Sequence, residues 1–234
     1  MKISFVIPTF NCAAWLHPAV DSCLKQSHKD IEIVIVDDAS TDSTKKYLTF
    51  LDSQNDKRIK IISLSKNVGR SEARNIGNRE ASGDVICVLD ADDLCYPKRA
   101  ELTVKAFEKG VKFLYGSAIM MNALGEPIRE LTADVFDKEK AENTLQNYIV
   151  HSTVAYTKEI STSFPYKSGD FSRLGIDDWM QQTEIFNSGV KLDFVPNVLS
   201  AYRVLGTSIT STRNIDDVVK LKKSVISKEE IQAV

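Results

Sequence analysis

The sequence predicts an α/β fold with a doubly wound, mostly parallel sheet and helices on both faces. Three apolar, β-branched runs, at residues 3–7, 31–36 and 85–89, each stop at a polar cluster, as buried parallel strands do. Segments with helical spacing of apolar residues separate these runs. A chain that alternates strands and helices forms a doubly wound sheet with right-handed crossovers between its strands. Such a sheet binds ligands beyond the carboxyl ends of its strands.

The elements of the first half follow one another at regular intervals. The apolar residues at 16–24 have helical spacing between the first two strands. Residues 58–62 form a fourth, shorter strand candidate, and helices are expected on either side of it at residues 41–51 and 71–80. The polar clusters that follow the strands are therefore where chemistry is expected.

The second half is less regular. Residues 112–121 form a strand candidate, and a turn is expected at residues 125–127. Residues 177–187 are expected to form a helix that ends at a glycine, and the last twenty residues read as a charged helix. That last helix has three interpretations: contact with a membrane surface, a solvated helix, or contact in a homodimer.

Composition favours one domain. The chain has 234 residues, of which 43% are hydrophobic, enough for one large α/β core. Its formal net charge is −2, and basic and acidic residues are mixed along the chain. No nucleic-acid partner is expected, because such partners need a basic patch.

The sequence favours the cytoplasm as the location. The opening apolar run is cut by Pro8 and is too short for a secretory signal. No stretch approaches the roughly 20 apolar residues of a membrane span, so any membrane contact is expected to be peripheral. The cysteines form no CxxC pair, which favours buried thiols over a zinc site; they are Cys12, Cys23, Cys87 and Cys95.

Glycine usage excludes two common nucleotide-binding solutions. No glycine precedes Gly69, so the glycine-rich loops of dinucleotide folds and P-loops are absent, as is that of sugar-1-phosphate nucleotidyltransferases. Phosphate binding would then need a metal ion. The Asp-Ala-Asp-Asp cluster at residues 90–93 supplies hard oxygen ligands for Mg²⁺ or Mn²⁺. The alternative is a turn or a helix cap.

Six segments, in this order, resemble the family-2 glycosyltransferases of the GT-A fold. They are Val-Ile-Pro-Thr-Phe-Asn at 6–11, Ile-Val-Asp-Asp-Ala-Ser-Thr-Asp at 35–42, Asn-Val-Gly-Arg-Ser-Glu-Ala-Arg-Asn-Ile-Gly at 67–77, Leu-Asp-Ala-Asp-Asp at 89–93, Asp-Asp-Trp at 177–179 and Tyr-Arg at 202–203. The resemblance implies a GT-A domain over residues 1–211, followed by a helical tail at 212–234. Within the domain it implies a nucleotide-sugar-binding half at 1–97 and an acceptor-binding half at 98–211.

The resemblance implies the following base pocket for the donor. Pro8, Thr9 and Phe10 form one side of it, and the Phe10 ring stacks on the nucleobase. Asp38, with Asp37 beside it, matches the carboxylate that accepts a hydrogen bond from the uracil ring in UDP-dependent relatives. The alternative for this pair is a turn that caps a helix.

The resemblance also assigns the phosphate side of the donor site. Arg74 matches an arginine near the pyrophosphate or the metal-binding aspartates; the alternative is a plain surface-helix arginine. Asp90, followed by Ala91, contacts the ribose or sugar. Asp92 is the direct ligand of Mn²⁺ or Mg²⁺, and Asp93 binds the metal through water or its own carboxylate.

On the acceptor side, the resemblance makes Asp178 the general base, with Asp177 in reserve. The alternative is an N-cap with an acidic first turn. Trp179 either packs in the core or stacks on a sugar, and His151 either faces the site or is structural. The polar stretch at residues 132–147 is a candidate acceptor-binding flap.

The implied activity is that of an inverting, metal-dependent hexosyl- or N-acetylhexosaminyl-transferase. It uses a nucleotide-diphosphate sugar, UDP-sugar favoured, and a hydroxyl of a glycan or lipid-linked acceptor at the inner face of the membrane. Many relatives have Tyr-Arg-x-His where this chain has Leu205, so one metal ligand is missing unless His151 replaces it. The alternative function is a non-catalytic nucleotide-sugar-binding module of a larger glycan-assembly complex.

Overall fold

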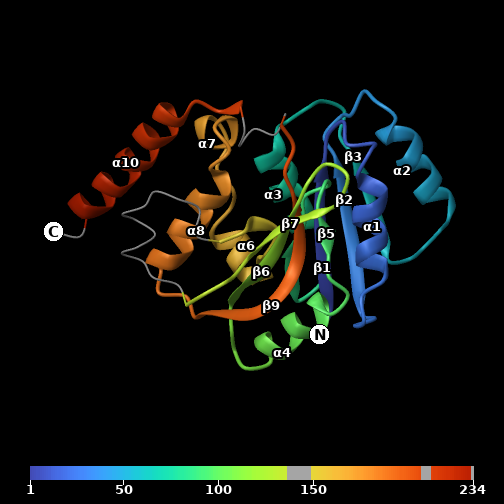
Figure 1. Ribbon diagram of the computed structural model, residues 1–234, viewed down its shortest axis with the longest axis horizontal. Coiled ribbons are helices and arrows are strands. Elements are labelled where there is room, and N and C mark those ends of the chain that lie inside the picture. Colours follow the sequence, from blue (N-terminus) through green and yellow to red (C-terminus); the bar gives the residue numbers. More distant parts are fainter. Residues whose placement is uncertain (136–148, 207–211, 233–234) are drawn as a thin grey trace.

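The computed structural model describes residues 1–135, 149–206 and 212–232, and one sheet with helices on both faces forms its centre (Figure 1). The strands lie in the order β3-β2-β1-β4-β8-β6-β9-β5, and β7 pairs with β6. The strands are β1 (Ile3–Thr9), β2 (Ile31–Asp37), β3 (Ile59–Ser63), β4 (Val85–Val88), β5 (Leu94–Cys95), β6 (Phe113–Met121), β7 (Pro127–Leu131), β8 (Ala155–Thr157) and β9 (Leu192–Arg203).

The first four strands form the parallel part of the sheet. β1 pairs with β2 and β4, and β2 pairs with β3, all in parallel. Every residue of β1 and β2 is buried, because both faces of these strands are covered, which explains their continuous apolar runs. In this register Thr9 is opposite Asp37, so the polar residues after β1 and β2 emerge side by side.

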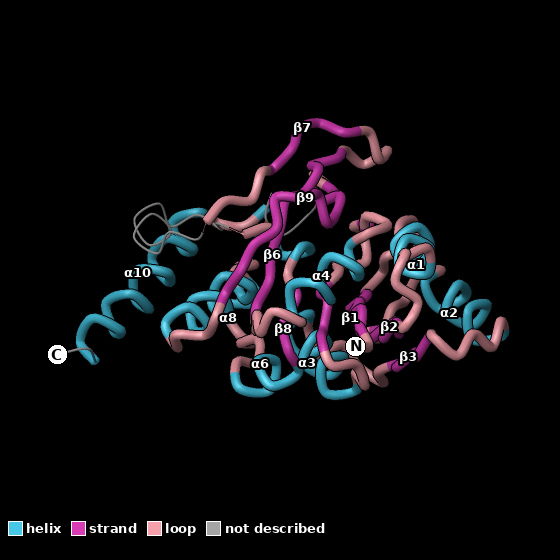
Figure 2. Tube along the Cα trace, turned by 90° about the horizontal axis from the view of Figure 1, so that it is seen from below, coloured by secondary structure: helices cyan, strands magenta, loops and turns pink. Residues whose placement is uncertain are grey.

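The second half extends the sheet with mixed pairings. β8 pairs antiparallel with both β4 and β6, and β6 and β9 pair in parallel. β5 pairs antiparallel with β9, which returns the end of β9 to the segment that follows β4. Figure 2 shows β7 and the end of β9 extending beyond the helical layers.

Helices cover both faces, as the sequence predicts. They are α1 (Leu16–Leu24), α2 (Thr44–Ser53), α3 (Arg70–Glu80), α4 (Arg99–Phe107), the 3₁₀ helix η1 (His151–Thr153), α6 (Lys158–Ser163), α7 (Asp170–Arg173), α8 (Asp177–Asn187) and α10 (Ile215–Gln232). The helices α1, α2 and α4 share an apolar core with one face of the sheet. The helices α3, α6 and α8 share a second core with the other face.

The C-terminal helix α10 packs on the body of the molecule through its first turns. Val218 is buried in a cluster with Leu174, Ile176 and Trp179, which come from the segment around α7 and α8. This part of the predicted tail is therefore neither fully solvated nor separate from the rest. Among the described residues, no helix has both the length and the apolar character needed to cross a membrane.

The structure confirms the predicted strands and helices of the first half, and adds elements that the sequence patterns did not indicate. The helix predicted at 41–51 begins at Thr44, whose backbone N–H donates to the Asp42 carboxylate. The added elements are β5, α4, β7, η1, β8, α6, α7 and the twelve-residue strand β9. Most of the candidate flap at 132–147, and the proposed domain boundary at 211, lie outside the described residues.

Helix α3 lies unusually close to the sheet at one glycine. A Cβ placed on Gly77 would lie 2.4 Å from the Val6 Cγ1 and 3.2 Å from the Val36 Cγ2. Both valines are buried in β1 and β2. The glycine therefore determines how closely α3, which carries site residues at its start, approaches the strand ends.

We expect Gly77→Ala to lower the free energy of unfolding by about 1–3 kcal/mol, because overpacking against two buried valines outweighs the better helix propensity of alanine. Chemical denaturation monitored by circular dichroism measures the change. Gly206→Ala is the matched control, since no atom of the described residues lies within 4 Å of its added Cβ. An unchanged or higher stability of Gly77→Ala would contradict the close packing of α3.

Candidate active site

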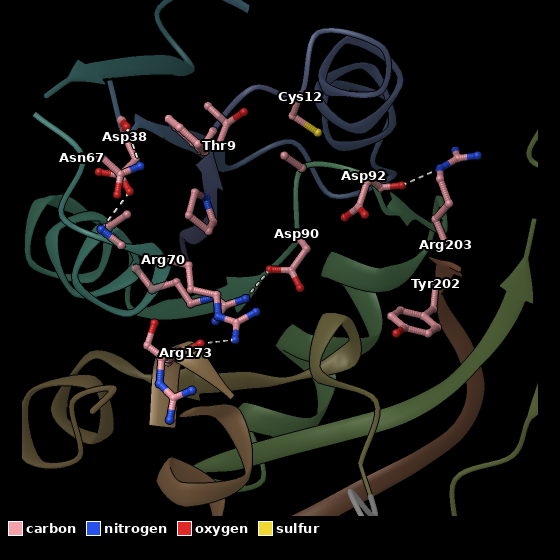
Figure 3. Close-up of a pocket in the computed structure, with 17 residues that line it drawn as sticks. Thr9, Cys12, Asp38, Asn67, Arg70, Asp90, Asp92, Arg173, Tyr202 and Arg203 are labelled. Atoms are coloured by element: carbon pink, nitrogen blue, oxygen red, sulfur yellow. Dashed lines mark hydrogen bonds and ion pairs between the residues drawn. The ribbon is translucent and has the colours of Figure 1, made fainter. Parts of the chain in front are cut away.

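The carboxyl ends of β1, β2 and β4 open into a cleft of about 560 Å³. Figure 3 shows Thr9, Asp38, Asp90 and Asp92 around this opening, which we call the donor cleft. It is lined by Pro8, Thr9, Phe10, Cys12, Asp38, Asn67, Gly69, Arg70, Ala73, Arg74, Asp90, Ala91, Asp92, Ser172, Arg173, Tyr202 and Arg203. The structure therefore brings together most of the nucleotide-binding residues that the sequence predicts.

Asp38 anchors the loop that leads into α3. Its carboxylate accepts backbone hydrogen bonds from Val68 at 2.6 Å and Gly69 at 2.9 Å. Gly69 has φ of 85°, a conformation that favours glycine, so the loop can fold back over the carboxylate. A carboxylate has about four acceptor positions, so two bonds leave room for a ligand donor.

Phe10 lines the donor cleft, whereas the neighbouring Asp37 does not. Asp37 is buried and accepts a hydrogen bond from the Ser40 backbone at 3.1 Å, so the structure does not bring its side chain to the cleft. This is the turn-forming role that was the alternative for the pair. Phe10 is 48% exposed at the cleft, an accessible aromatic face.

Arg74 joins the two halves of the site. Its guanidinium is buried and makes two ion pairs, at 2.6 Å to Asp90 and at 2.7 Å to Asp177. Asp177 is also buried, accepts a hydrogen bond from the Ser71 hydroxyl at 3.0 Å, and pairs with Arg70 at 3.2 Å. Arg74 is therefore not a surface arginine, and Asp177 is held inside the molecule.

The cluster at residues 90–93 faces in two directions. Asp92 lines the donor cleft, whereas Asp93 is buried and accepts hydrogen bonds from the Arg203 backbone, at 2.7 Å, and from the Ser152 hydroxyl. The structure thus gives Asp93 a structural connection between β5, β9 and η1, and does not place it on the cleft.

Burial and mutual repulsion shape the charges of this cluster. Burial, together with the neighbouring charge of Asp90, raises the pKa of Asp92 to about 6. Burial also acts to raise the pKa of Asp90, but the Arg74 guanidinium outweighs it and lowers that pKa to about 2. Asp90 therefore stays ionised, and the raised pKa of Asp92 reflects a concentration of negative charge that a cation would relieve.

The donor set suits a magnesium-like ion that shares its ligands with a substrate. Among the described residues, no three His, Cys, Asp or Glu side chains form a ready-made metal site. Mg²⁺ and Mn²⁺ commonly bind through one or two carboxylates together with substrate phosphates and water. Asp92, with Asp90 beside it, fits that pattern.

A second cleft, of about 630 Å³, adjoins the first. We call it the acceptor-side cleft; it is lined by Arg70, Arg74, Asp90, Leu131, Ile149, Val150, His151, Gly175, Asp177, Asp178, Tyr202, Arg213, Ile215, Val218, Val219 and Lys222. Four of these also line the donor cleft: Arg70, Arg74, Asp90 and Tyr202. The two clefts therefore meet at the Arg74 ion pairs.

Asp178 lies in the first turn of α8 and lines the acceptor-side cleft. It is half-buried, and its carboxylate accepts the backbone N–H of Trp179 at 2.8 Å. Trp179 is only 6% exposed and packs in the cluster under α10, which matches its packing interpretation. Of the acidic pair, Asp178 is thus the accessible carboxylate.

His151 belongs to the acceptor-side cleft. Its Nε2 lies 3.3 Å from the Tyr166 hydroxyl, and its buried Nδ1 has no hydrogen-bond partner among the described residues. Burial and the charge of Arg74 lower its pKa, so the imidazole is neutral near pH 7. The described lining of the donor cleft, where Asp92 lies, does not include His151.

Sequence reasoning missed several residues of these clefts. Arg70 lies inside a quoted segment, so its position before Arg74 was a usable signal. Arg173, Arg213 and Lys222 lie in regions without a recognised motif. Their approach to the site depends on how α7 and α10 pack, which local sequence patterns do not reveal.

Comparison with known proteins gives a family and a fold. The profile described as "Glycosyl transferase family 2" matches residues 4–162. The UDP-Glc:alpha-D-GlcNAc-diphosphoundecaprenol beta-1,3-glucosyltransferase WfgD of Escherichia coli is 32% identical over 122 residues, 51% of this chain and 47% of WfgD. Five uncharacterized glycosyltransferases are matched over only 15% to 36% of their own length. The putative teichuronic acid biosynthesis glycosyltransferase TuaG of Bacillus subtilis is 25% identical over 212 residues, 90% of this chain and 82% of TuaG.

Two solved structures share the fold. TarS of S. aureus in complex with UDP-GlcNAc has a TM-score of 0.68 at 19% identity, covering 95% of this chain and 65% of TarS. The mannosyltransferase PcManGT from Pyrobaculum calidifontis, in complex with GDP-Man and Mn²⁺, has a TM-score of 0.66 at 19% identity. The match covers 89% of this chain and 58% of PcManGT. These likenesses confirm the GT-A fold predicted from the sequence.

We expect Asp177→Asn to lower the free energy of unfolding by about 3–5 kcal/mol, because it leaves the buried Arg74 without one of its two charged partners. Asp178→Asn is the matched control, and its half-buried carboxylate should cost about 1 kcal/mol or less. Denaturation midpoints of the two variants decide the question. Equal midpoints would show that the Arg74 ion pairs do not support the fold.

Proposed function

The chain belongs to glycosyl transferase family 2, and we propose that it transfers a sugar from a nucleotide-diphosphate donor to an acceptor hydroxyl, with inversion. The observation that carries this proposal is the junction of the two clefts. Asp90 and Arg74 line both, so a donor in one cleft would present its sugar to an acceptor in the other. The accessible carboxylate Asp178 lines the second cleft.

UDP is the favoured nucleotide of the donor. Asp38 retains acceptor positions for a base N–H, and the exposed Phe10 ring offers a stacking surface. The UDP-GlcNAc of the TarS complex and the UDP-Glc in the name of WfgD support the same choice. In this proposed arrangement the nucleobase lies beyond β1 and β2, and the diphosphate lies toward Asp92.

A divalent ion, Mn²⁺ or Mg²⁺, would be held by Asp92 with Asp90 beside it, and would supply positive charge opposite the diphosphate. The Mn²⁺ in the PcManGT complex supports this proposal. Asp90 is oriented by its ion pair with Arg74, so its carboxylate keeps one position at the boundary between the clefts. Arg70 and Arg173 line the donor cleft and add positive charge on the side of α3 and α7.

The reaction is a single displacement at the anomeric carbon. The acceptor oxygen forms the new bond to that carbon, and the bond to the diphosphate oxygen breaks, with its electron pair leaving on the nucleotide. Asp178 takes the proton of the acceptor hydroxyl as general base. Attack from the acceptor-side cleft, opposite the departing diphosphate, inverts the anomeric configuration.

The acceptor is proposed to be a glycan or a lipid-linked sugar. WfgD is named for a diphosphoundecaprenol-linked acceptor, which supports a lipid-linked class. His151 lines the same cleft as Asp178, so its neutral imidazole would border a bound acceptor. The imidazole is held in place by Tyr166, so it is oriented before the acceptor binds.

We expect UDP binding to require Mn²⁺ or Mg²⁺, because the diphosphate otherwise meets the negative charge of Asp92 and Asp90. Calorimetric titration with UDP, with and without EDTA, measures this dependence, and Asp92→Ala should lose most of the affinity gained from the metal. Asp52→Ala, which removes an exposed carboxylate on α2, is the control. Equal UDP affinity with and without metal would refute the metal assignment.

We expect Asp178→Asn to retain UDP affinity and to lose roughly 10²–10⁴-fold in transfer rate, the usual contribution of a general base. UDP release from a panel of UDP-sugars and acceptors, with Mn²⁺ present, measures the rate. If the wild-type chain binds UDP but transfers to no acceptor in the panel, the non-catalytic binding module becomes the better description. Full activity of Asp178→Asn would mean that another residue is the general base.

A further inference from the structure

Arg203, at the end of β9, lies beside the aspartate cluster that follows β4 and has no part in the proposed displacement. β5 and β9 pair antiparallel, with Leu94 opposite Ala201. Continuing this register along both chains, toward lower numbers in one and higher numbers in the other, sets Asp92 opposite Arg203. The pairing of two short stretches of strand therefore brings an arginine next to the proposed metal ligand.

Arg203 holds the segment of Asp92 and Asp93 at two points. Its Nε donates to the carbonyl oxygen of Asp92 at 2.8 Å, a bond that Figure 3 marks with a dashed line. Its backbone N–H donates to the buried carboxylate of Asp93 at 2.7 Å. One residue thus fixes the backbone of Asp92 and the side chain of the next residue, which limits the directions in which the Asp92 carboxylate can point.

The same guanidinium also binds the turn between β6 and β7. Its Nη1 donates to the carbonyl oxygens of Asn122 at 3.1 Å and Ala123 at 2.9 Å. Together with the bond to Asp92, all three of these side-chain bonds end on backbone carbonyl oxygens, and Arg203 is only 6% exposed. A planar guanidinium can donate in several directions at once, so Arg203 joins two loops that are distant in the sequence.

The turn that receives Arg203 is held by its own hydrogen bonds. The side-chain oxygen of Asn122 accepts the backbone N–H groups of Leu124 at 2.9 Å and of Glu126 at 3.0 Å. Gly125 has φ of 86°, which favours glycine, and its N–H donates to the carbonyl oxygen of Asn122 at 3.0 Å. The turn therefore presents its carbonyl oxygens to Arg203 in a fixed arrangement.

We infer that Arg203 is a positioning residue for the carboxylate of Asp92 and that the β6–β7 turn supports it, an inference that rests on the proposed metal-dependent transfer. Loss of a group that holds a metal ligand in place typically costs 10–100-fold in metal affinity. Arg203 lines the donor cleft at its edge, whereas residues 122–126 are not part of the cleft lining. Metal-dependent binding in the donor cleft therefore depends on a turn outside it.

Two substitutions test the two ends of this connection. Arg203→Lys keeps the positive charge near Asp92 but cannot span carbonyl oxygens in two loops, because an ammonium is a compact donor. Asn122→Ala removes the acceptor that holds the turn and leaves every cleft residue in place. Arg129→Gln removes an exposed charge from β7 of the same hairpin and is the matched control.

Calorimetry measures the Kd of UDP at saturating Mn²⁺ for each protein, and NMR titration measures the Kd of uridine in EDTA. Uridine lacks the diphosphate, so it reports on the base pocket alone. We expect Arg203→Lys to weaken UDP binding with Mn²⁺ roughly tenfold or more. Asn122→Ala should weaken it roughly threefold or more, because one set of turn hydrogen bonds is lost. Uridine affinity should be the same in all four proteins, and Arg129→Gln should bind UDP like the wild type.

Three outcomes would overturn the inference. The first is that Arg203→Lys binds UDP with Mn²⁺ as tightly as the wild type. The second is that it loses uridine affinity to the same extent, which would make Arg203 a residue that only supports the fold. The third is an unchanged UDP affinity in Asn122→Ala, and this variant decides alone if circular dichroism shows that Arg203→Lys does not fold.

A failure of the proposed function looks different in the same experiment. If the wild type binds UDP equally well with Mn²⁺ and with EDTA, the metal assignment at Asp92 is wrong, whatever the variants do. If the wild type depends on Mn²⁺ and the variants match it, the metal assignment stands and only the role of Arg203 is lost.

Discussion

The site depends on the buried guanidinium of Arg74 and its two carboxylate partners. Arg74 lies in α3, Asp90 follows β4, and Asp177 begins α8, so one side chain connects three separate parts of the chain. A buried charge of this kind is tolerated only when its partners are in place. The pairs therefore hold the Asp92 end of the donor cleft and the start of α8 at one relative position, which determines where Asp178 and Asp92 can lie.

At three places in the chain, two adjacent aspartates differ in their burial and contacts. In each pair one aspartate is buried and bonded to the protein, and the other lines a cleft; the pairs are Asp37 and Asp38, Asp93 and Asp92, and Asp177 and Asp178. Neighbouring side chains point in different directions along an extended chain or a helix turn. The inward member orients the backbone, and its neighbour is presented to the cleft as a result.

The C-terminal helix connects the fold to the acceptor side. Val218 buries α10 against the cluster around Trp179, and the same helix brings Lys222 over the Trp179 ring. The face of α10 that packs is thus continuous with the face that lines the cleft. Figure 1 shows α10 on the opposite side of the molecule from α1 and α2. The part of the acceptor-side cleft that α10 lines is therefore remote from the proposed base pocket.

Local patterns in the sequence were sufficient for the parallel half of the fold and for the location of the donor cleft. Strands buried on both faces leave continuous apolar runs, and ligand-binding residues follow such strands, so the polar clusters that contain Thr9, Asp38 and Asp92 could be located from the chain alone. Strand β9 could not, because its burial is irregular and its pairing partner β6 lies about 80 residues earlier. A strand held by distant pairing has no strong local signal.

The sequence by itself determined the alternation of strands and helices, the acidic clusters at the strand ends, and the family. Only the tertiary structure decided which aspartate of each pair faces a cleft, that Arg74 bridges Asp90 and Asp177, and that Arg213 and Lys222 reach the acceptor side. Periodicity reports how one element is buried. It carries no information on contacts between residues 100 positions apart, where packing against other elements selects the orientation of a side chain.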